Sequence, residues 1–280
     1  MIKSLLIGLD GSEDSRSALE LGIRWARRFD AVVVGIGIVD EPGLFNSGQS
    51  LLGGTGAHYW RTTFPAHLLS GARREVSKHL EEFLWRCSEA GVECKTLEDV
   101  GSPFVQILIE AQRYDLVLLG QRTHFDFRSQ DEPDETLSKV IQDSPRPVVA
   151  VPATPGGGEA IVVAYDGSLQ AARAVYAFEA SGLGGTCKVH VVSAARVQKD
   201  AVRHTDWAVG FLRLHEIEAI SHPMETTAPT AEVILGKVRE FDAGLLVMGA
   251  YGQPVLREFF LGSVTRTVLK ASTVPVFCYH

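Results

Sequence analysis

The chain has 280 residues, of which 45% are hydrophobic, and a formal net charge of −7. This length predicts one large or two small domains, and the apolar share favours packed cores over disorder. Because no run of Lys or Arg exceeds two residues, the basic patch that nucleic acid or an anionic membrane would require is missing, which excludes both as expected partners.

Cysteine and histidine placement bounds the chemistry. The four cysteines form no Cys-x-x-Cys pair, and no histidine cluster stands at metal-ligand spacing. We therefore expect reduced thiols and no metal site. Met1-Ile2-Lys3 leads directly into an expected strand, which predicts no signal peptide. The longest apolar run, Ala31–Val39, is about half of a transmembrane helix, so a soluble cytoplasmic protein is expected.

The first expected strand covers Ser4–Leu9 and ends in the turn Asp10-Gly11-Ser12. A stretch with helical hydrophobic period follows, and Ser12 is a natural N-cap for it. The next strand, Ala31–Val39, is β-branched and continuously apolar, which is typical of a parallel strand buried on both faces.

The long segment Glu41–Ala72 is rich in Gly, Ser and aromatic residues. A loop of that length inside a compact domain predicts a lid or an interaction surface. Two further strands are expected at Tyr114–Gly120 and Pro145–Val151. The Pro/Gly-rich stretch Ala153–Gly158 then predicts a linker.

The same order of elements returns after the linker. Ala160–Tyr165 ends in Asp166-Gly167-Ser168, and later strands are expected at Lys188–Ser193, Phe241–Gly249 and Thr273–Tyr279. This repetition predicts two tandem domains, residues 1–153 and 159–280. Strands that alternate with helices predict an α/β fold with an open, parallel, Rossmann-like sheet in each domain.

The closing strands of the two copies, Val148–Val151 and Val276–Tyr279, are both apolar. An uncovered edge of that kind invites aggregation. We therefore expect the domains to form a pseudo-dimer in which each closing strand meets the edge of the other domain.

The most specific chemical pattern follows the apolar run Leu245–Met248. Gly249, Gly252, Gly262 and Ser263 stand at Gly-x2-Gly-x9-Gly-Ser spacing. The first two glycines let a backbone pass close to a ligand, and the last pair opens a helix whose free N–H groups attract an anion. The pattern predicts a phosphate-binding loop; the alternative is a glycine-rich turn that caps a helix and binds nothing.

The first copy departs from this pattern. After Gly120 comes Gln121-Arg122-Thr123-His124, without a second glycine, and Asp134-Glu135 stands opposite the Gly262-Ser263 pair. Carboxylates repel a triphosphate, and Arg122 offsets this only in part. The first copy is therefore expected not to bind ATP.

Both halves together resemble the universal stress protein family in its tandem two-domain form, with an adenine-nucleotide alpha-hydrolase-like fold. The resemblance covers nearly the whole chain. It is carried by Asp166, by Gly249-x2-Gly252-x9-Gly262-Ser263, by Leu261–Val264 and by the closing Pro275-Val276.

The resemblance implies ATP at the carboxyl edge of the second sheet, where an open α/β sheet binds ligands in general. By this resemblance Asp166 would meet the ribose and adenine edge, and Val191 would offer its backbone to the adenine. The phosphates would contact Gly249, Gly252, Gly262 and Ser263. A Mg²⁺ ion would bridge the phosphates. Gln253 stands where several members have a basic residue, which weakens the implied phosphate contact.

The expected function is a nucleotide-occupied switch in stress response, in a chain that dimerises further. No catalytic residue is assigned, because only Arg257, Glu258 and Arg266 lie near the loop and histidines such as His204 show no catalytic spacing. Hydrolysis of ATP is expected to be slow or absent. The alternatives are an interaction scaffold with both sites empty and a slow ATPase.

Overall fold

The computed structural model of the chain describes residues 1–41, 43, 66–125, 134–185, 187–250 and 262–280. Its contacts divide the chain into two compact units. We call Lys3–Val140 the N-terminal unit, and Met1–Ile2 together with Ile141–His280 the C-terminal unit. Both consist of alternating strands and helices, which confirms the predicted α/β class. Within the described ranges no helix is long and apolar enough to span a lipid bilayer.

The N-terminal unit has a parallel sheet in the order β3-β2-β1-β4. Its last helix, α6, begins in this unit and ends just beyond the boundary at Val140. The elements are β1 (Ser4–Gly8), α1 (Glu13–Phe29), β2 (Val32–Val39), α4 (Ala66–Ala90), β3 (Cys94–Val100), α5 (Pro103–Ala111), β4 (Leu116–Gly120) and α6 (Thr136–Asp143).

The C-terminal unit repeats this strand order as β8-β7-β6-β9 and adds β10 and β5 beyond β9. The elements are β5 (Val148–Val151), β6 (Ala160–Ala164), α7 (Leu169–Ser181), β7 (Val189–Ala195), α8 (Gln198–Leu214), β8 (Ala219–Glu225), α9 (Thr230–Glu240), β9 (Ala243–Gly249), α10 (Ser263–Ala271) and β10 (Val276–Tyr279).

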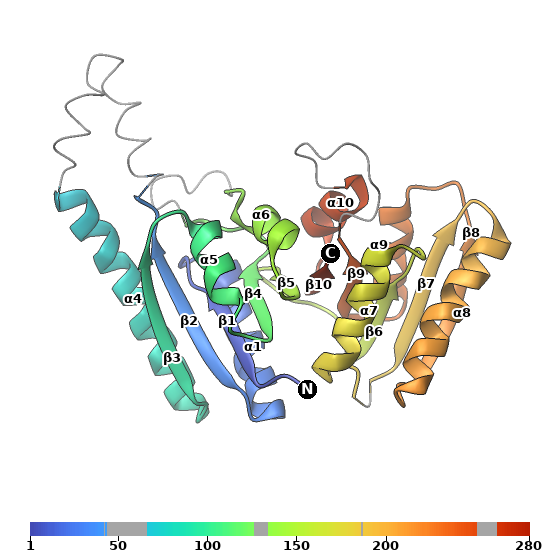
Figure 1. Ribbon diagram of the computed structural model, residues 1–280, viewed down its shortest axis with the longest axis horizontal. Helices are drawn as coiled ribbons and strands as arrows, with labels where there is room; N and C mark the ends of the chain where they lie inside the picture. The colour runs from blue at the N-terminus through green and yellow to red at the C-terminus, as the bar shows by residue number, and fades with distance from the viewer. Residues whose placement is uncertain (42, 44–65, 126–133, 186, 251–261) are drawn as a thin grey trace, which may run out of the picture. The chain divides into compact units, whose positions relative to one another are not determined.

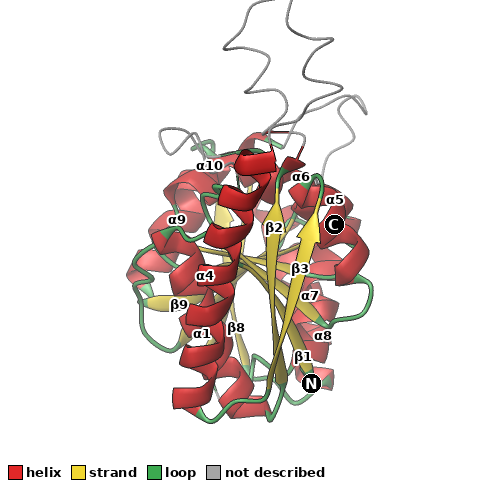
Figure 2. Cartoon of the chain, turned by 90° about the vertical axis from the view of Figure 1, so that its left-hand side faces the viewer, coloured by secondary structure: helices red, strands yellow, loops and turns green. Residues whose placement is uncertain are grey.

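Helices cover both faces of each sheet. The chain steps from β1 to β3 in one direction and returns to β4 in the other, so right-handed crossovers put α1 and α4 on one face and α5 on the opposite face. Figure 2 shows this arrangement around β2 and β3. In the C-terminal unit the same argument pairs α7 with α8 and α9 with α10, and both pairs are in contact; the elements can be followed in Figure 1.

The core lies between the central strands and these helices. β1 and β6 are buried along nearly their whole length, whereas most residues of the outer strands β3 and β8 are exposed or half-buried. Ser12 Oγ accepts from Ser15 N–H and Ser168 Oγ accepts from Ala171 N–H, each at 3.1 Å. Both predicted N-caps are thereby confirmed.

The closing strands of the two sequence copies pair with each other. β10 runs parallel to β9 on one side and antiparallel to β5 on the other, with Phe277 opposite Val149. As expected for apolar strands, β5 and β10 each cover the edge that the other presents to it. The boundary between the compact units therefore precedes β5, before the linker at residues 153–158.

Candidate functional site

Both Asp-Gly-Ser turns have the same backbone shape. Gly11 and Gly167 each adopt a φ of +78°, in the left-handed region that favours glycine. In the C-terminal unit Ser168 N–H donates to Asp166 Oδ1 at 3.0 Å, and the corresponding bond in the N-terminal unit is 2.9 Å long. The sequence repeat therefore encodes one local structure, which presents a carboxylate at the carboxyl edge of each sheet.

The two carboxylates differ in accessibility. Asp10 is 6% exposed, and its second oxygen accepts from His124 N–H at 2.7 Å. Burial raises the pKa of Asp10, although these backbone donors oppose the rise. Asp166 is exposed, and within the described part of the chain the Ser168 amide is its one hydrogen-bond donor. An oxygen of Asp166 is thus available to a ligand hydroxyl.

Val191 does not lie where the resemblance puts it. It is fully buried inside β7, opposite Val163 of β6 and Ser221 of β8. Its backbone is therefore enclosed by strands on both sides, which leaves the predicted contact of Val191 with an adenine without an exposed backbone group. The reason is register, because the residue stands in the interior of the strand and not at its carboxyl end.

Ala194, two residues beyond Val192 on β7, lies past the end of β6. Val192 accepts a hydrogen bond from Tyr165 N–H at 2.9 Å, so its backbone groups point toward the β6 side. Backbone groups alternate between the two neighbours along a strand, and Ala194 therefore points the same way. Since β6 ends at Ala164, which pairs with Val192, Ala194 faces the space beyond that strand.

Gly249 has a packing role that requires no ligand. A Cβ at this position would lie 2.6 Å from the carbonyl carbon of Gln170 in the first turn of α7. Gly120 is placed in the same way against α1, where a Cβ would lie 2.8 Å from the Cβ of Asp14. Both strand-terminal glycines thus let the next helix approach the sheet, whether or not phosphate binds nearby.

Gly262 and Ser263 open α10, and both are exposed. Among the described residues no side chain caps this helix. A Cβ on Gly262 would meet no atom closer than Thr265 Oγ1, at 3.9 Å. Within the part of the chain that the structure describes, the first N–H groups of α10 thus have no side-chain acceptor, and such groups attract anions. Gly252, the other predicted phosphate contact, lies outside the described residues.

In the N-terminal unit a carboxylate holds the corresponding position. Asp134 accepts from Thr136 N–H and from Phe125 N–H, each at 2.8 Å, and from Thr123 Oγ1. The start of α6 thus has its own anion. Arg122 pairs with Asp14 at 3.4 Å, so it is held by a different carboxylate. The expectation that this copy does not bind ATP rests on Asp134.

A histidine packs over the glycine of both turns, a contact that sequence reasoning missed. A Cβ at Gly11 would lie 2.5 Å from Cε1 of His79 on α4, and a Cβ at Gly167 would lie 2.6 Å from Cδ2 of His204 on α8. His204 Nδ1 also lies 3.3 Å from Ser193 Oγ. Alignment of α4 with α8 would have revealed the pair, but the segment inserted before α4 hides their equivalence.

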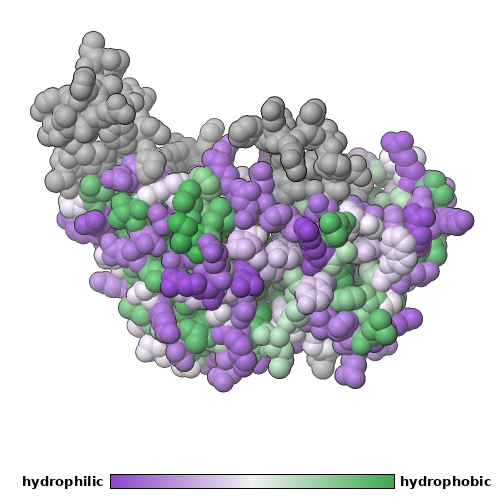
Figure 3. Space-filling model, in the orientation of Figure 1, coloured by the Kyte–Doolittle hydropathy of each residue, from purple (hydrophilic) through white to green (hydrophobic). Residues whose placement is uncertain are grey.

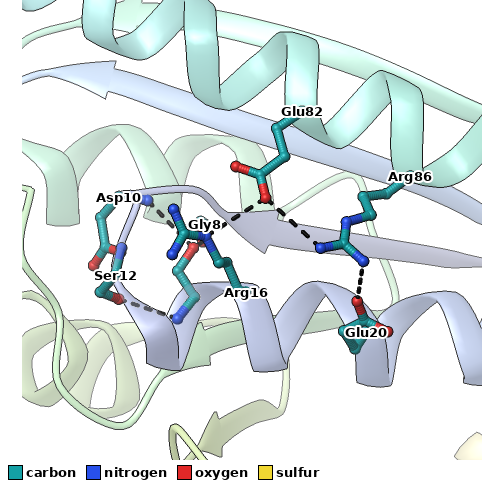
Figure 4. A network of polar contacts seen from close by, with 8 residues as sticks. Gly8, Asp10, Ser12, Arg16, Glu20, Glu82 and Arg86 are labelled. Carbon is teal, nitrogen blue, oxygen red and sulfur yellow. Dashed lines mark hydrogen bonds and ion pairs between the residues drawn. The ribbon is translucent and has the colours of Figure 1, made fainter.

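The seam between α1 and α4 is polar, as Figure 4 shows together with the Asp10 turn. Arg16 pairs with Glu82 at 3.5 Å, and Arg86 pairs with Glu20 at 2.9 Å. Each of these side chains is more than a third exposed, so solvent screening leaves such pairs little effect on stability. The predicted lid or interaction segment at residues 41–72 falls mostly outside the described residues.

Comparison with known proteins gives a consistent result. The family model described as the universal stress protein family matches residues 1–152 and again residues 159–280. Universal stress protein Slr1230 from Synechocystis sp. is 25% identical over 170 residues, which are 60% of this chain and 58% of that protein. The chain therefore spans less than two thirds of the length of this curated relative.

Solved structures agree on the fold. A universal stress protein from Archaeoglobus fulgidus DSM 4304 superposes with a TM-score of 0.73 at 20% identity, over 99% of this chain and 97% of that one. A putative universal stress protein from Pseudomonas aeruginosa UCBPP-PA14 gives a TM-score of 0.56 at 16% identity, over 99% and 93%. At these identities the likeness speaks to architecture and not to ligands.

Proposed function

Because the chain belongs to the universal stress protein family, we propose that it binds one adenine nucleotide, ATP with Mg²⁺, in its C-terminal unit. The contrast between two helix starts carries the proposal. The start of α10 at Gly262 is uncapped within the described residues, whereas the start of α6 is filled by the Asp134 carboxylate. One fold thus presents an open anion position in one copy and a self-occupied position in the other.

The proposed contacts follow the carboxyl edge of the sheet. Asp166 accepts from ribose hydroxyls, and the backbone of Ala194 takes the adenine role first assigned to Val191. Gly262 and Ser263 donate to phosphate oxygens, and Gly252 completes this loop in the proposal. Mg²⁺ would arrive with the phosphates, since it keeps phosphate oxygens and water as most of its ligands.

The role we propose is regulation by occupancy. Backbone donors that hold a triphosphate stabilise the ground state and the transition state alike, which gives no acceleration by itself. Any hydrolysis is therefore expected to be slow, and nucleotide occupancy is the signal. A cytoplasmic location and further dimerisation remain predictions.

An interaction scaffold is the second candidate. Figure 3 shows hydrophobic side chains gathered over α5, where Val105 is 38% and Ile109 is 51% exposed. Exposed apolar side chains in one place favour a protein contact. This function does not require nucleotide, so the same binding experiment separates the two.

Calorimetric titration with ATP and Mg²⁺ tests the proposal. We expect one site per chain. Gly262→Asp, which copies the carboxylate of the first unit, should abolish binding. Gly210→Asp is the matched control, because Gly210 lies on α8 with no atom within 4 Å of an added Cβ. Two equivalent sites, no binding by the unaltered chain, or undiminished binding in Gly262→Asp would each contradict the proposal.

A further inference from the structure

Two histidines far apart in the sequence meet on the sheet face that α9 covers. His190 lies on β7 and His222 on β8, and His190 Nδ1 is 2.9 Å from His222 Nε2. In the parallel register His190 stands opposite Ile220, and His222 stands opposite Val192. The two imidazoles are thus diagonal neighbours on one face of the sheet. Their facing nitrogens are close enough for one metal ion to contact both.

Their surroundings keep both rings in place. Phe241 stacks on His190 with ring centroids 4.1 Å apart and planes at 12°, and it lies 4.6 Å from the ring of His222. Lys237 of α9 sits over the Phe241 ring at 5.3 Å and pairs with Glu240 at 2.8 Å. This cluster lies apart from the Asp166 turn, because it is on the opposite face from α8 and His204.

Neutral imidazoles are favoured here. Burial lowers the pKa of His190, and Lys188 lowers it further. Burial also lowers the pKa of His222, with His190 and Lys237 acting in the same direction and Glu240 opposing them. A neutral imidazole has one nitrogen with a free lone pair, which is the form that binds metals.

We propose that His190 and His222 form a two-nitrogen site for a late divalent transition-metal ion, with Cu²⁺ bound more tightly than Ni²⁺ or Zn²⁺. Imidazole suits these ions, and the order of affinity follows the general series for nitrogen ligands. Metal–nitrogen bonds of about 2.0–2.1 Å span the 2.9 Å between the two nitrogens with an angle of about 90° at the metal.

Binding requires no net loss of a proton at neutral pH. One of the two facing nitrogens carries the shared hydrogen, and that ring frees its lone pair by moving the hydrogen to its other nitrogen. Within the described residues no group of three His, Cys, Asp or Glu side chains could hold a metal, so water would complete the coordination. The nearby charges act in opposite directions, because Lys188 and Lys237 repel a cation and Glu240 attracts one.

Titration of the metal-free full chain with Cu²⁺, followed by electron paramagnetic resonance, tests the site. We expect one strong ion per chain with hyperfine splitting from two nitrogens. His190→Gln and His222→Gln should each weaken binding by about tenfold or more and remove one nitrogen from the spectrum. His215→Gln is the matched control, since His215 lies in the same unit and pairs with Glu179.

The Lys237–Glu240 pair gives an independent check that leaves both imidazoles intact. Lys237→Met should strengthen Cu²⁺ binding, and Glu240→Gln should weaken it. A spectrum that keeps two nitrogens in His222→Gln, or equal responses of these two variants, would overturn the site. The same holds for an unaltered chain that binds no Cu²⁺, because the histidines would then share only a proton.

Discussion

Gly249 and Gly262 belong to the same sequence pattern but have different local surroundings. Gly249 faces the backbone of α7, where an added Cβ would lie 2.6 Å from Gln170, whereas among the described residues a Cβ at Gly262 would meet only Thr265 Oγ1, at 3.9 Å. A glycine that permits close packing and a glycine that exposes helix N–H groups respond differently to the same substitution. Within one motif, Gly249 therefore has a packing role, whereas Gly262 is proposed to have a binding role.

We predict that Gly249→Ala lowers the free energy of unfolding by about 1–3 kcal/mol, because backbone must move to admit the methyl group. Gly262→Ala should cost less than about 1 kcal/mol, since it changes only the N-cap residue. Urea denaturation of the two variants and the unaltered chain measures the difference. A Gly249→Ala variant with unchanged stability and no nucleotide binding would return that glycine to a purely ligand-related role.

Among the secondary-structure elements, we expect polar contacts at helix starts to stabilise the fold more than ion pairs on exposed helix surfaces. Asp134 receives two backbone N–H groups and a hydroxyl at the start of α6. Glu20 on α1 contacts a single guanidinium of α4 on an exposed surface. The first arrangement gives an acceptor to Thr136 N–H, which has none inside the helix, and ties the start of α6 to Phe125 and Thr123. The second arrangement replaces contacts with water.

Asp134→Ala is accordingly expected to lower the free energy of unfolding by about 0.5–2 kcal/mol. Glu20→Ala should lower it by no more than about 1 kcal/mol, and added salt should remove that difference. Urea denaturation at low and high ionic strength measures both. A larger loss from Glu20→Ala than from Asp134→Ala would contradict this ranking.

In the whole molecule, the strand β5 belongs to one half by sequence repeat and to the other half by its contacts. It belongs to the first repeat in the chain, but it packs with Ile141–His280 and covers the edge of β10. A fragment that starts after the linker would lose this cover. Its apolar edge would then offer unpaired N–H and C=O groups to other chains.

We predict that fragment 141–280 aggregates less than fragment 159–280 in light scattering under the same conditions. Val149→Pro in fragment 141–280 is the control of equal length. Val149 pairs with Phe277, and proline disrupts the ladder there. That variant should behave like fragment 159–280, and equal behaviour of all three fragments would show that the pairing of β5 does not protect the edge.

Features that depend on neighbouring residues are encoded directly in the order of the amino acids. The two Asp-Gly-Ser turns, the caps at Ser12 and Ser168, and the repeated order of strands and helices follow from local hydrogen bonding and hydrophobic period. The pair Asp134-Glu135 also indicates, from the sequence alone, a carboxylate at the start of α6. Each of these features involves groups a few residues apart, so the chain order already contains the information.

Features that depend on strand register and on contacts between distant segments arise when the chain folds and cannot be derived from local sequence. The burial of Val191 inside the sheet and the position of Ala194 past the end of β6 follow from where β6 ends beside β7. The contact of His190 with His222, and the packing of His79 and His204 over glycine, join residues whose separations vary with the intervening loops. Strand register and loop length set such contacts, because a shift of one residue moves every side chain to the other face of the sheet.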